Sequence, residues 1–260
     1  MPKTNFPLIS VIMNCYNGSK YLKNSIKSLL NQKYKNWELI FWDNKSIDDS
    51  KKILLGFKDK RIKYFKSKNF LSLYKARNLA INKASGKYIS FLDTDDWWSI
   101  NKLKEQVTLI EKKKINFIYS NFYKYDNFTK TKKLNFENKL SEGYITQSLL
   151  DNYNIGILTV MVRKNVFKNK KFDDRYNIIG DFDFFVKLSL EEEFMCIQKP
   201  LAFYRVHEKN LSRKIKVYFS EFKFWLTKNE NKFRKLNYSL FHLKLYYFRL
   251  KIKYLFKYVF

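Results

Sequence analysis

Apolar runs of strand length alternate with segments of helical periodicity over the first 120 residues, and this alternation constrains the fold more than any other feature. The runs cover residues 10–16, 37–43, 87–93 and 115–121, and residues 61–67 alternate between polar and apolar like a strand. Apolar residues at helical spacing predict helices between these runs. The alternation predicts an α/β fold in which helices cover a mostly parallel sheet.

Polar and acidic side chains gather where three of the predicted strands end. These groups are Asn14 to Asn17, Asp43, and Asp93 to Asp96. Ligands of open parallel sheets bind outside the carboxyl ends of the strands. We therefore expect the three groups to meet at one edge of the sheet and to form the functional site.

Three carboxylates lie within four residues in the stretch SFLDTDDWW. Asp93, Asp95 and Asp96 repel one another unless a cation lies between them. A hard divalent ion with oxygen ligands, Mg²⁺ or Mn²⁺, would resolve this repulsion and would also bind substrate phosphates. A helix N-cap explains Asp96 equally well, but it does not explain Asp93 and Asp95 at a strand end.

Two common nucleotide-binding signatures are missing from the sequence. Neither GxGxxG nor GxxxxGK[ST] occurs, which excludes the dinucleotide fingerprint and the P-loop. A diphosphate would then be held by a metal and by basic side chains. Arg77, on the predicted helix that leads into the Asp93 strand, is either such a group or a solvated surface arginine.

The cysteine content and the start of the chain bear on where the protein works. Cys15 and Cys196 supply neither a disulfide framework nor the spacing of a zinc site, so we expect a reduced, cytosolic setting. The opening MPKTNFPLIS lacks the apolar core of a signal peptide. The sequence has no run of about 18 apolar residues, so we expect no transmembrane helix.

Residues 213–260 are both basic and aromatic. They contain 13 Lys and Arg against two acids, Glu221 and Glu230, within a chain of net charge +28. We place a boundary near residue 212 and expect contact with an anionic membrane. Packing on the domain or on a partner chain is the alternative. Part of the charge is also typical of an AT-rich genome.

Several sequence blocks occur in the order and spacing of a known family. The blocks are SVIMNCYNGSKYLKNSIKSLLNQ (10–32), WELIFWDNKSIDDS (37–50) and ARNLAINKASGKYISFLDTDDWW (76–98). The chain resembles glycosyltransferase family 2, strongly over 8–110 and more weakly to about 212. The resemblance implies a GT-A fold, with a Rossmann-like, mixed, mostly parallel sheet. Residues 1–120 would be the nucleotide-sugar half of a 1–212 domain, 121–212 the acceptor half, and 213–260 a helical extension.

The resemblance also assigns roles to the residues at the strand ends. Tyr16 and Asp43 would hold the base of a nucleotide-sugar donor, and Arg77 would orient the nucleotide. Asp93 would lie near the ribose and metal, and Asp95 would be the metal ligand, with Asp96 in the same shell. Asn14 and Asn17, at the same predicted edge, are counted with the donor site.

Two later blocks complete the expected site. In GDFDFFVKL (180–188) the family often carries Glu-Asp, and here Gly180 replaces the Glu while Asp181 would be the general base. Asp183 is expected only to cap a helix. In YRVHEKNLS (204–212), Arg205 would bind an anion and His207 would lie near the diphosphate or metal.

The leading interpretation is an inverting, metal-dependent glycosyltransferase that uses Mn²⁺ or Mg²⁺. It would move a sugar from a nucleotide-sugar, UDP-linked by expectation, to a glycan or lipid-linked acceptor at the inner face of the bacterial plasma membrane. No nucleic acid is expected as a partner, and acceptor specificity is expected in 122–175.

Two alternatives stay open. The first is a nucleic-acid-binding protein, suggested by the charge and by 19% aromatic residues, which leaves the acidic strand ends unexplained. The second is a non-catalytic family member that binds a sugar nucleotide. The presence of every matched aspartate argues against it.

Overall fold

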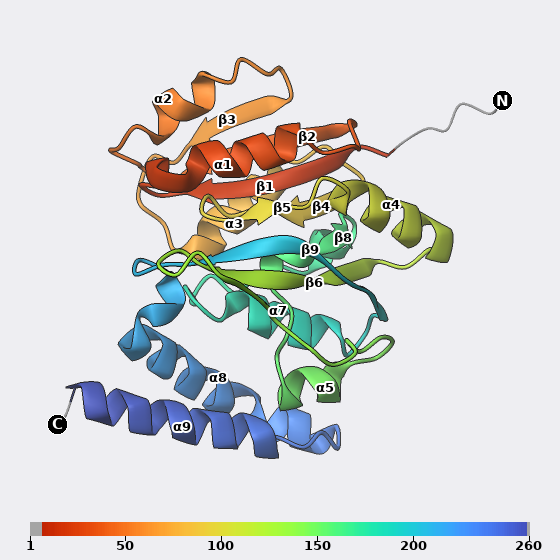
Figure 1. Cartoon of the computed structure of the whole chain (residues 1–260). Helices are drawn as coiled ribbons and strands as arrows, with labels where there is room; N and C mark the ends of the chain where they lie inside the picture. Colours follow the sequence, from red (N-terminus) through yellow and green to blue (C-terminus); the bar gives the residue numbers. More distant parts are fainter. Residues whose placement is uncertain (1–6, 259–260) are drawn as a thin grey trace.

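Nine strands form one mixed sheet in the computed structural model, which describes residues 7–258 (Figure 1). Their order is β3-β2-β1-β4-β8-β6-β9-β5, with β7 also paired to β6. The strands are β1 (Ile9–Cys15), β2 (Trp37–Asp43), β3 (Ile62–Lys66), β4 (Tyr88–Phe91), β5 (Trp97–Trp98), β6 (Phe117–Asp126), β7 (Lys132–Leu134), β8 (Met161–Arg163) and β9 (Phe194–Val206). The predicted mixed α/β sheet is confirmed.

Helices lie on both faces of this sheet. They are α1 (Ser19–Leu30), α2 (Ser50–Leu55), α3 (Leu73–Asn82), α4 (Lys102–Lys113), α5 (Thr146–Asp151), α6 (Val166–Asn169), α7 (Gly180–Leu188), α8 (Ile215–Lys235) and α9 (Phe241–Tyr258), with 3₁₀ turns η1 (Ile157–Thr159) and η2 (Leu211–Arg213). The predicted helical C-terminal extension is therefore present.

The central strands are covered on both faces, which explains their unbroken apolar sequences. All seven residues of β1 and of β2 are buried. Val11 and Met13 of β1 pack in one layer with α1 and α4, whereas Ile12 belongs to the layer with α3 and α7. Strands β3, β2, β1 and β4 are parallel, and Cys15 pairs with Asp43, so β1 and β2 end side by side.

Three predicted boundaries in the second half differ from the structure. The run at 115–121 belongs to β6, which continues to Asp126 and turns into β7, so the polar segment after residue 121 begins as a hairpin. The run LTVMVRK (158–164) predicts a strand, but only its residues Met161–Arg163 form one, β8. The N–H and hydroxyl of Thr159 both donate to the carbonyl of Gly156, which closes the η1 turn and delays the strand.

The pattern LAFYRVHEKNLS (201–212) predicts a strand that runs into a loop, and β9 begins seven residues earlier, at Phe194. Pro200 lies where the β6–β9 register shifts, so the strand passes the proline at an irregularity. The strand ends at Val206, and the predicted loop follows it.

Helices α8 and α9 form the layer farthest from β3, next to α7 (Figure 1). Trp225 of α8 is fully buried, and its ring lies 4.9 Å from that of Phe182 in α7. Leu243 and Leu250 of α9 belong to the same core. Within residues 7–258, none of the helices combines the length and apolar character needed to cross a bilayer.

Candidate functional site

The loops that follow β1 and β4 touch at the carboxyl edge of the sheet. A Cβ atom on Gly18 would stand 2.7 Å from Oγ1 of Thr94, so the close approach needs a glycine. The hydroxyl of Ser25 in α1 lies 2.8 Å from the carbonyl of Thr94 and 2.5 Å from that of Asp96. These contacts bring residues Asp93 to Asp96, the acidic loop, against the Asn17-Gly18 turn, as the strand pattern predicts.

Asp43 lies in a polar pocket at the end of β2. Its carboxylate is buried and accepts the N–H of Ser46 and the hydroxyl of Tyr64, both at 2.7 Å. Lys45, two residues after Asp43, has φ of 69°, a left-handed conformation that ordinarily favours glycine. The loop thus holds Asp43 in one orientation.

Tyr16 is 54% exposed beside Asp43, and its ring meets that of Phe70 edge to face with centroids 4.7 Å apart. Asn17 adopts φ of 52°, and its Oδ1 accepts the N–H of Ile47, which joins the two loops. An exposed aromatic pair beside a fixed carboxylate is suited to stacking and hydrogen bonding with a nucleotide base.

Asn14, the last residue but one of β1, has a buried amide. It is 9% exposed, and neither its Oδ1 nor its Nδ2 has a hydrogen-bond partner among the described residues. Buried amides are ordinarily paired. A polar ligand at this edge would supply the missing partner, which agrees with the prediction that Asn14 belongs to the donor site.

Each carboxylate of the acidic loop has a different partner. Asp93 pairs with a guanidinium nitrogen of Arg77 at 2.9 Å, and Asp95 meets Nε2 of His207 at 2.8 Å. Asp96 is 1% exposed and accepts the N–H of Arg205 at 2.8 Å.

Burial and mutual repulsion act together on these acids. Burial raises the pKa of Asp93, the positive charge of Arg77 opposes that rise, and Asp95 adds to it. Burial and the charges of Asp95 and Asp93 raise the pKa of Asp96 well above its ordinary value. A bound cation would relieve this repulsion, and the metal stays a prediction.

Arg205 braces the acidic loop from β9. Its Nε donates to the carbonyl of Asp95 at 2.8 Å, and its guanidinium lies 4.5 Å from the ring centroids of both Tyr21 and Trp97. The side chain is 8% exposed. This geometry fixes the loop, and anion binding by Arg205 stays a prediction.

His207 lies between the acidic loop and its own backbone. Its Nδ1 accepts the N–H of Lys209 at 3.2 Å, so Nε2 carries the proton of the neutral ring and donates it to Asp95. The arrangement suits a hydrogen-bond donor that orients Asp95. Metal binding through Nε2 would require the ring to release Lys209.

The donor set fits a metal ion that the substrate helps to hold. Among residues 7–258, no group of three or more His, Cys, Asp or Glu side chains lies where it could hold a metal ion by itself. Asp93 and Asp95 are 33% and 26% exposed at their side chains, so both remain accessible. Mg²⁺ typically takes one or two carboxylates, several waters and substrate phosphates. Asp96 faces inward, and its place as a ligand stays a prediction.

Asp181, the predicted base, stands at the start of α7. The hydroxyl of Tyr74 lies 3.1 Å from its Oδ1, and that of Tyr153 lies 3.2 Å from its Oδ2. Burial raises the pKa of Asp181, while the charge of Arg77 and the two hydroxyls oppose that rise. Burial also raises the pKa of both tyrosines, which keeps them protonated donors.

Sequence analysis missed these two tyrosines. Tyr74 lies three residues before Arg77 on α3, a spacing that places both side chains on one face of the helix. That face meets both Asp93 and Asp181, so the i, i+3 relationship is the signal that finds Tyr74. The sequence contains no comparable signal for Tyr153, which lies outside the helices.

The extension holds the segment that leads into Asp181. The carboxylate of Glu221 in α8 accepts the N–H groups of Asn177, Ile178 and Ile179 at 2.7 to 3.1 Å. About one turn further along α8, the indole N–H of Trp225 donates to Asp183 at 2.9 Å. Asp183 thus binds the extension in addition to standing in the first turn of α7.

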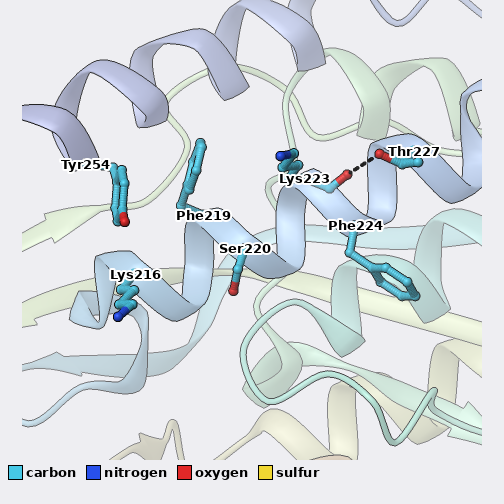
Figure 2. A pocket seen from close by; sticks show the side chains of 7 residues that line it. All are labelled: Lys216, Phe219, Ser220, Lys223, Phe224, Thr227 and Tyr254. Atoms are coloured by element: carbon cyan, nitrogen blue, oxygen red, sulfur yellow. Dashed lines mark hydrogen bonds between the residues drawn. The ribbon is translucent and has the colours of Figure 1, made fainter.

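A shallow hollow lies on α8 at its contact with α9 (Figure 2). Figure 2 shows Tyr254 of α9 beside Phe219 of α8, with Lys216 about one turn before Phe219 and Ser220 directly after it. The lining contains no carboxylate and none of the predicted site residues. The acidic edge of the sheet is therefore the better candidate for chemistry.

The chain is similar to a known family over more than half of its length. A family model described as "Glycosyl transferase family 2" matches residues 10–175, more than half of the chain. The chain is 36% identical over 165 residues to the UDP-Glc:alpha-D-GlcNAc-diphosphoundecaprenol beta-1,3-glucosyltransferase WfgD of Escherichia coli. That alignment covers 64% of each chain, which is less than two thirds of the length of WfgD.

A longer alignment joins the chain to an uncharacterized glycosyltransferase of Haemophilus influenzae. It is 32% identical over 212 residues and covers 80% of this chain and 83% of that protein. Among solved structures, S. aureus TarS 1–349 in complex with UDP-GlcNAc superposes with a TM-score of 0.69 at 19% identity. The match covers 84% of this chain and 66% of TarS 1–349, and it shows a shared fold. By the family model and the identity to these relatives, the chain belongs to glycosyltransferase family 2.

Proposed function

We propose that the protein transfers a sugar from a UDP-linked donor to a hydroxyl of a lipid-linked glycan during synthesis of a bacterial surface polysaccharide. One observation carries the proposal. A carboxylate of raised pKa, Asp181, lies between two tyrosine hydroxyls, and Arg77 acts electrostatically on both this group and the acidic loop. A base and a donor-binding edge are thus joined by one helix.

Asp181 acts as the base in this proposal. In its charged form it accepts the proton of the acceptor hydroxyl while that oxygen bonds to the anomeric carbon. The bond from that carbon to the diphosphate breaks, and its electron pair leaves with the nucleotide. Attack opposite the leaving group inverts the anomeric configuration.

The acidic edge holds the donor. Tyr16 and Asp43 bind the nucleotide base of the donor. Asn14 offers its unpaired amide to the donor, and Arg77 positions Asp93. Bound Mn²⁺ or Mg²⁺ would offset the charge on the departing diphosphate, with Asp95 as its leading ligand.

The names of the relatives support the substrate class. WfgD is described by a UDP-Glc donor and a diphosphoundecaprenol-linked acceptor, and TarS was solved with UDP-GlcNAc. The chain is also 33% identical over 118 residues to TuaG of Bacillus subtilis, which is described as a teichuronic acid biosynthesis glycosyltransferase. We infer that the protein acts at the inner face of the plasma membrane, where it would reach a lipid-linked acceptor from the cytoplasm.

A transfer assay tests the proposal. Purified protein is incubated with a panel of UDP-, GDP- and dTDP-sugars, a synthetic lipid-diphosphate-GlcNAc acceptor, and Mn²⁺, Mg²⁺ or chelator, and products are read by mass spectrometry. We expect a UDP-sugar to be used, with UDP-glucose the first to test.

Asp181→Asn should retain UDP binding and lose transfer by at least about a hundredfold. Asp174→Asn, an exposed carboxylate in the same segment, is the matched control and should transfer normally. Transfer that survives Asp181→Asn would place the base elsewhere.

A further inference from the structure

Helix α9 has two apolar faces, and one of them packs against the rest of the protein. At about 100° per residue, Leu243, Tyr247 and Leu250 share a face. Leu243 and Leu250 are 5% and 7% exposed. The ring of Tyr247 stacks on Phe219 of α8 with centroids 5.3 Å apart. This face accounts for the packing of α9 on the domain.

The opposite face forms a second apolar stripe that points outward. Phe241, Leu245, Phe248 and Ile252 follow one another at spacings of four, three and four residues. Their exposed fractions are 67%, 38%, 57% and 39%. Folding of the chain leaves this stripe in water, and a contiguous exposed apolar patch marks an interaction surface.

Cations border the stripe on both sides. On the helical wheel, Arg249 and Lys253 lie along one border and Lys251 along the other. All three are exposed, and none takes part in the ion pairs found within residues 7–258. No Asp or Glu follows Glu230 in the sequence. Such side chains can extend past an apolar stripe to reach anions above it.

We propose that this stripe inserts into the interface of an anionic lipid bilayer, with Arg249, Lys251 and Lys253 on lipid phosphates. An anionic membrane offers an apolar layer beneath a negatively charged one, which matches both parts of the stripe. A second copy would bring two sets of cations together. A nucleic acid would engage the cations and leave Phe241 and Phe248 in water.

The arrangement of the extension relates this surface to the site. Helix α8 starts soon after β9, whose end carries Arg205, and Phe219 near its start stacks on Tyr254 near the end of α9. The two helices are antiparallel (Figure 1). The C-terminal half of α9 therefore lies at the end of the extension nearer the acidic edge. The functional link between this surface and the acidic edge rests on the proposed lipid-linked acceptor.

Vesicle sedimentation with the full chain tests the proposal without donor or acceptor, so its result is independent of glycosyl transfer. Vesicles contain equal phosphatidylglycerol and phosphatidylcholine, or phosphatidylcholine alone. The stripe variant is Leu245→Ser with Phe248→Ser, and its control is Leu55→Ser with Phe128→Ser, two exposed apolar residues elsewhere. The charge variant is Lys251→Gln with Lys253→Gln, and its control is Lys112→Gln with Lys113→Gln on α4.

We expect strong binding to the anionic vesicles only. The stripe variant should weaken that binding roughly tenfold or more, and the charge variant should weaken it roughly fivefold per cation removed. Circular dichroism and UDP binding should match those of the unaltered protein.

Three results would overturn the proposal. Equal losses in the control variants would show attraction by the overall charge. Equal binding to both vesicle types would remove the role of the cations. A lipid-free dimer that the stripe variant dissociates, without vesicle binding, would assign the stripe to a second copy.

Discussion

The ring of Tyr74 lies over Gly180 so closely that a Cβ atom at position 180 would stand 2.4 Å from Cδ2 of the tyrosine. Gly180 occupies the place where the family often carries Glu beside the catalytic Asp. Here an aromatic ring fills that space, and its hydroxyl reaches Asp181. The departure at Gly180 and the tyrosine contact at Asp181 are thus two parts of one packing arrangement.

Gly180→Ala should displace Tyr74 and destabilise the protein by about 1–3 kcal/mol, the usual cost of overpacking. Urea unfolding measures this cost. In a Tyr74→Ala background the same change should cost much less, because the obstructing ring is gone. Equal costs in the two backgrounds would contradict the proposed contact.

Tyr74→Phe should move the acidic limb of the rate profile to higher pH. The hydroxyl stabilises the charged form of Asp181, so its removal raises a pKa that burial has already raised above the usual 3.8. Because the base works when deprotonated, kcat/KM rises as pH passes through this pKa. The profile of kcat/KM from pH 4 to 9 measures the limb. Tyr144→Phe, an exposed tyrosine, should leave it in place.

Glu221→Gln should destabilise the fold by about 1–3 kcal/mol, since a neutral amide replaces a buried carboxylate that accepts three backbone N–H groups. Transfer should fall while UDP binding persists, because the segment before Asp181 loosens. Urea unfolding and calorimetry with UDP measure the two effects. Glu230→Gln on the same helix removes only surface ion pairs and should cost under about 1 kcal/mol.

Asp95→Asn should abolish the stimulation of transfer by Mn²⁺ or Mg²⁺ and lower the rate roughly a hundredfold or more. The protein should stay folded, since Asp95 is partly exposed. Transfer rates across a metal titration provide the measurement, with exposed Asp49→Asn as control. If chelator leaves the unaltered protein fully active, Asp95 serves another purpose.

Strands β1, β2 and β4 could be predicted because they are buried on both faces and therefore read as unbroken apolar runs. The meeting of Asn17, Asp43 and the acidic loop followed from the rule for strand ends. Ser72 shows a limit of local patterns. Its place just before the helical pattern of residues 73–84 predicts an N-cap, yet its hydroxyl donates to the carbonyl of Asp174, about a hundred residues away.

The supports of Asp181 could not be predicted for the same physical reason. Tyr153 and Glu221 reach it, or the segment before it, from elements that the sequence does not place near it. Their hydrogen bonds depend on how α7 and α8 pack, and no short spacing encodes that packing. The identity of Asp181 as the base remains a prediction that the assay above can test.

The grip of α8 on α7 has a consequence for chimaeras. The family match ends at residue 175, yet Glu221 and Trp225 complete the hydrogen bonds of residues 177–183. A chain shortened at residue 212 would expose Phe182 and leave those N–H groups without their carboxylate. A chimaera made to exchange specificity between relatives should therefore carry α7 and α8 from the same parent.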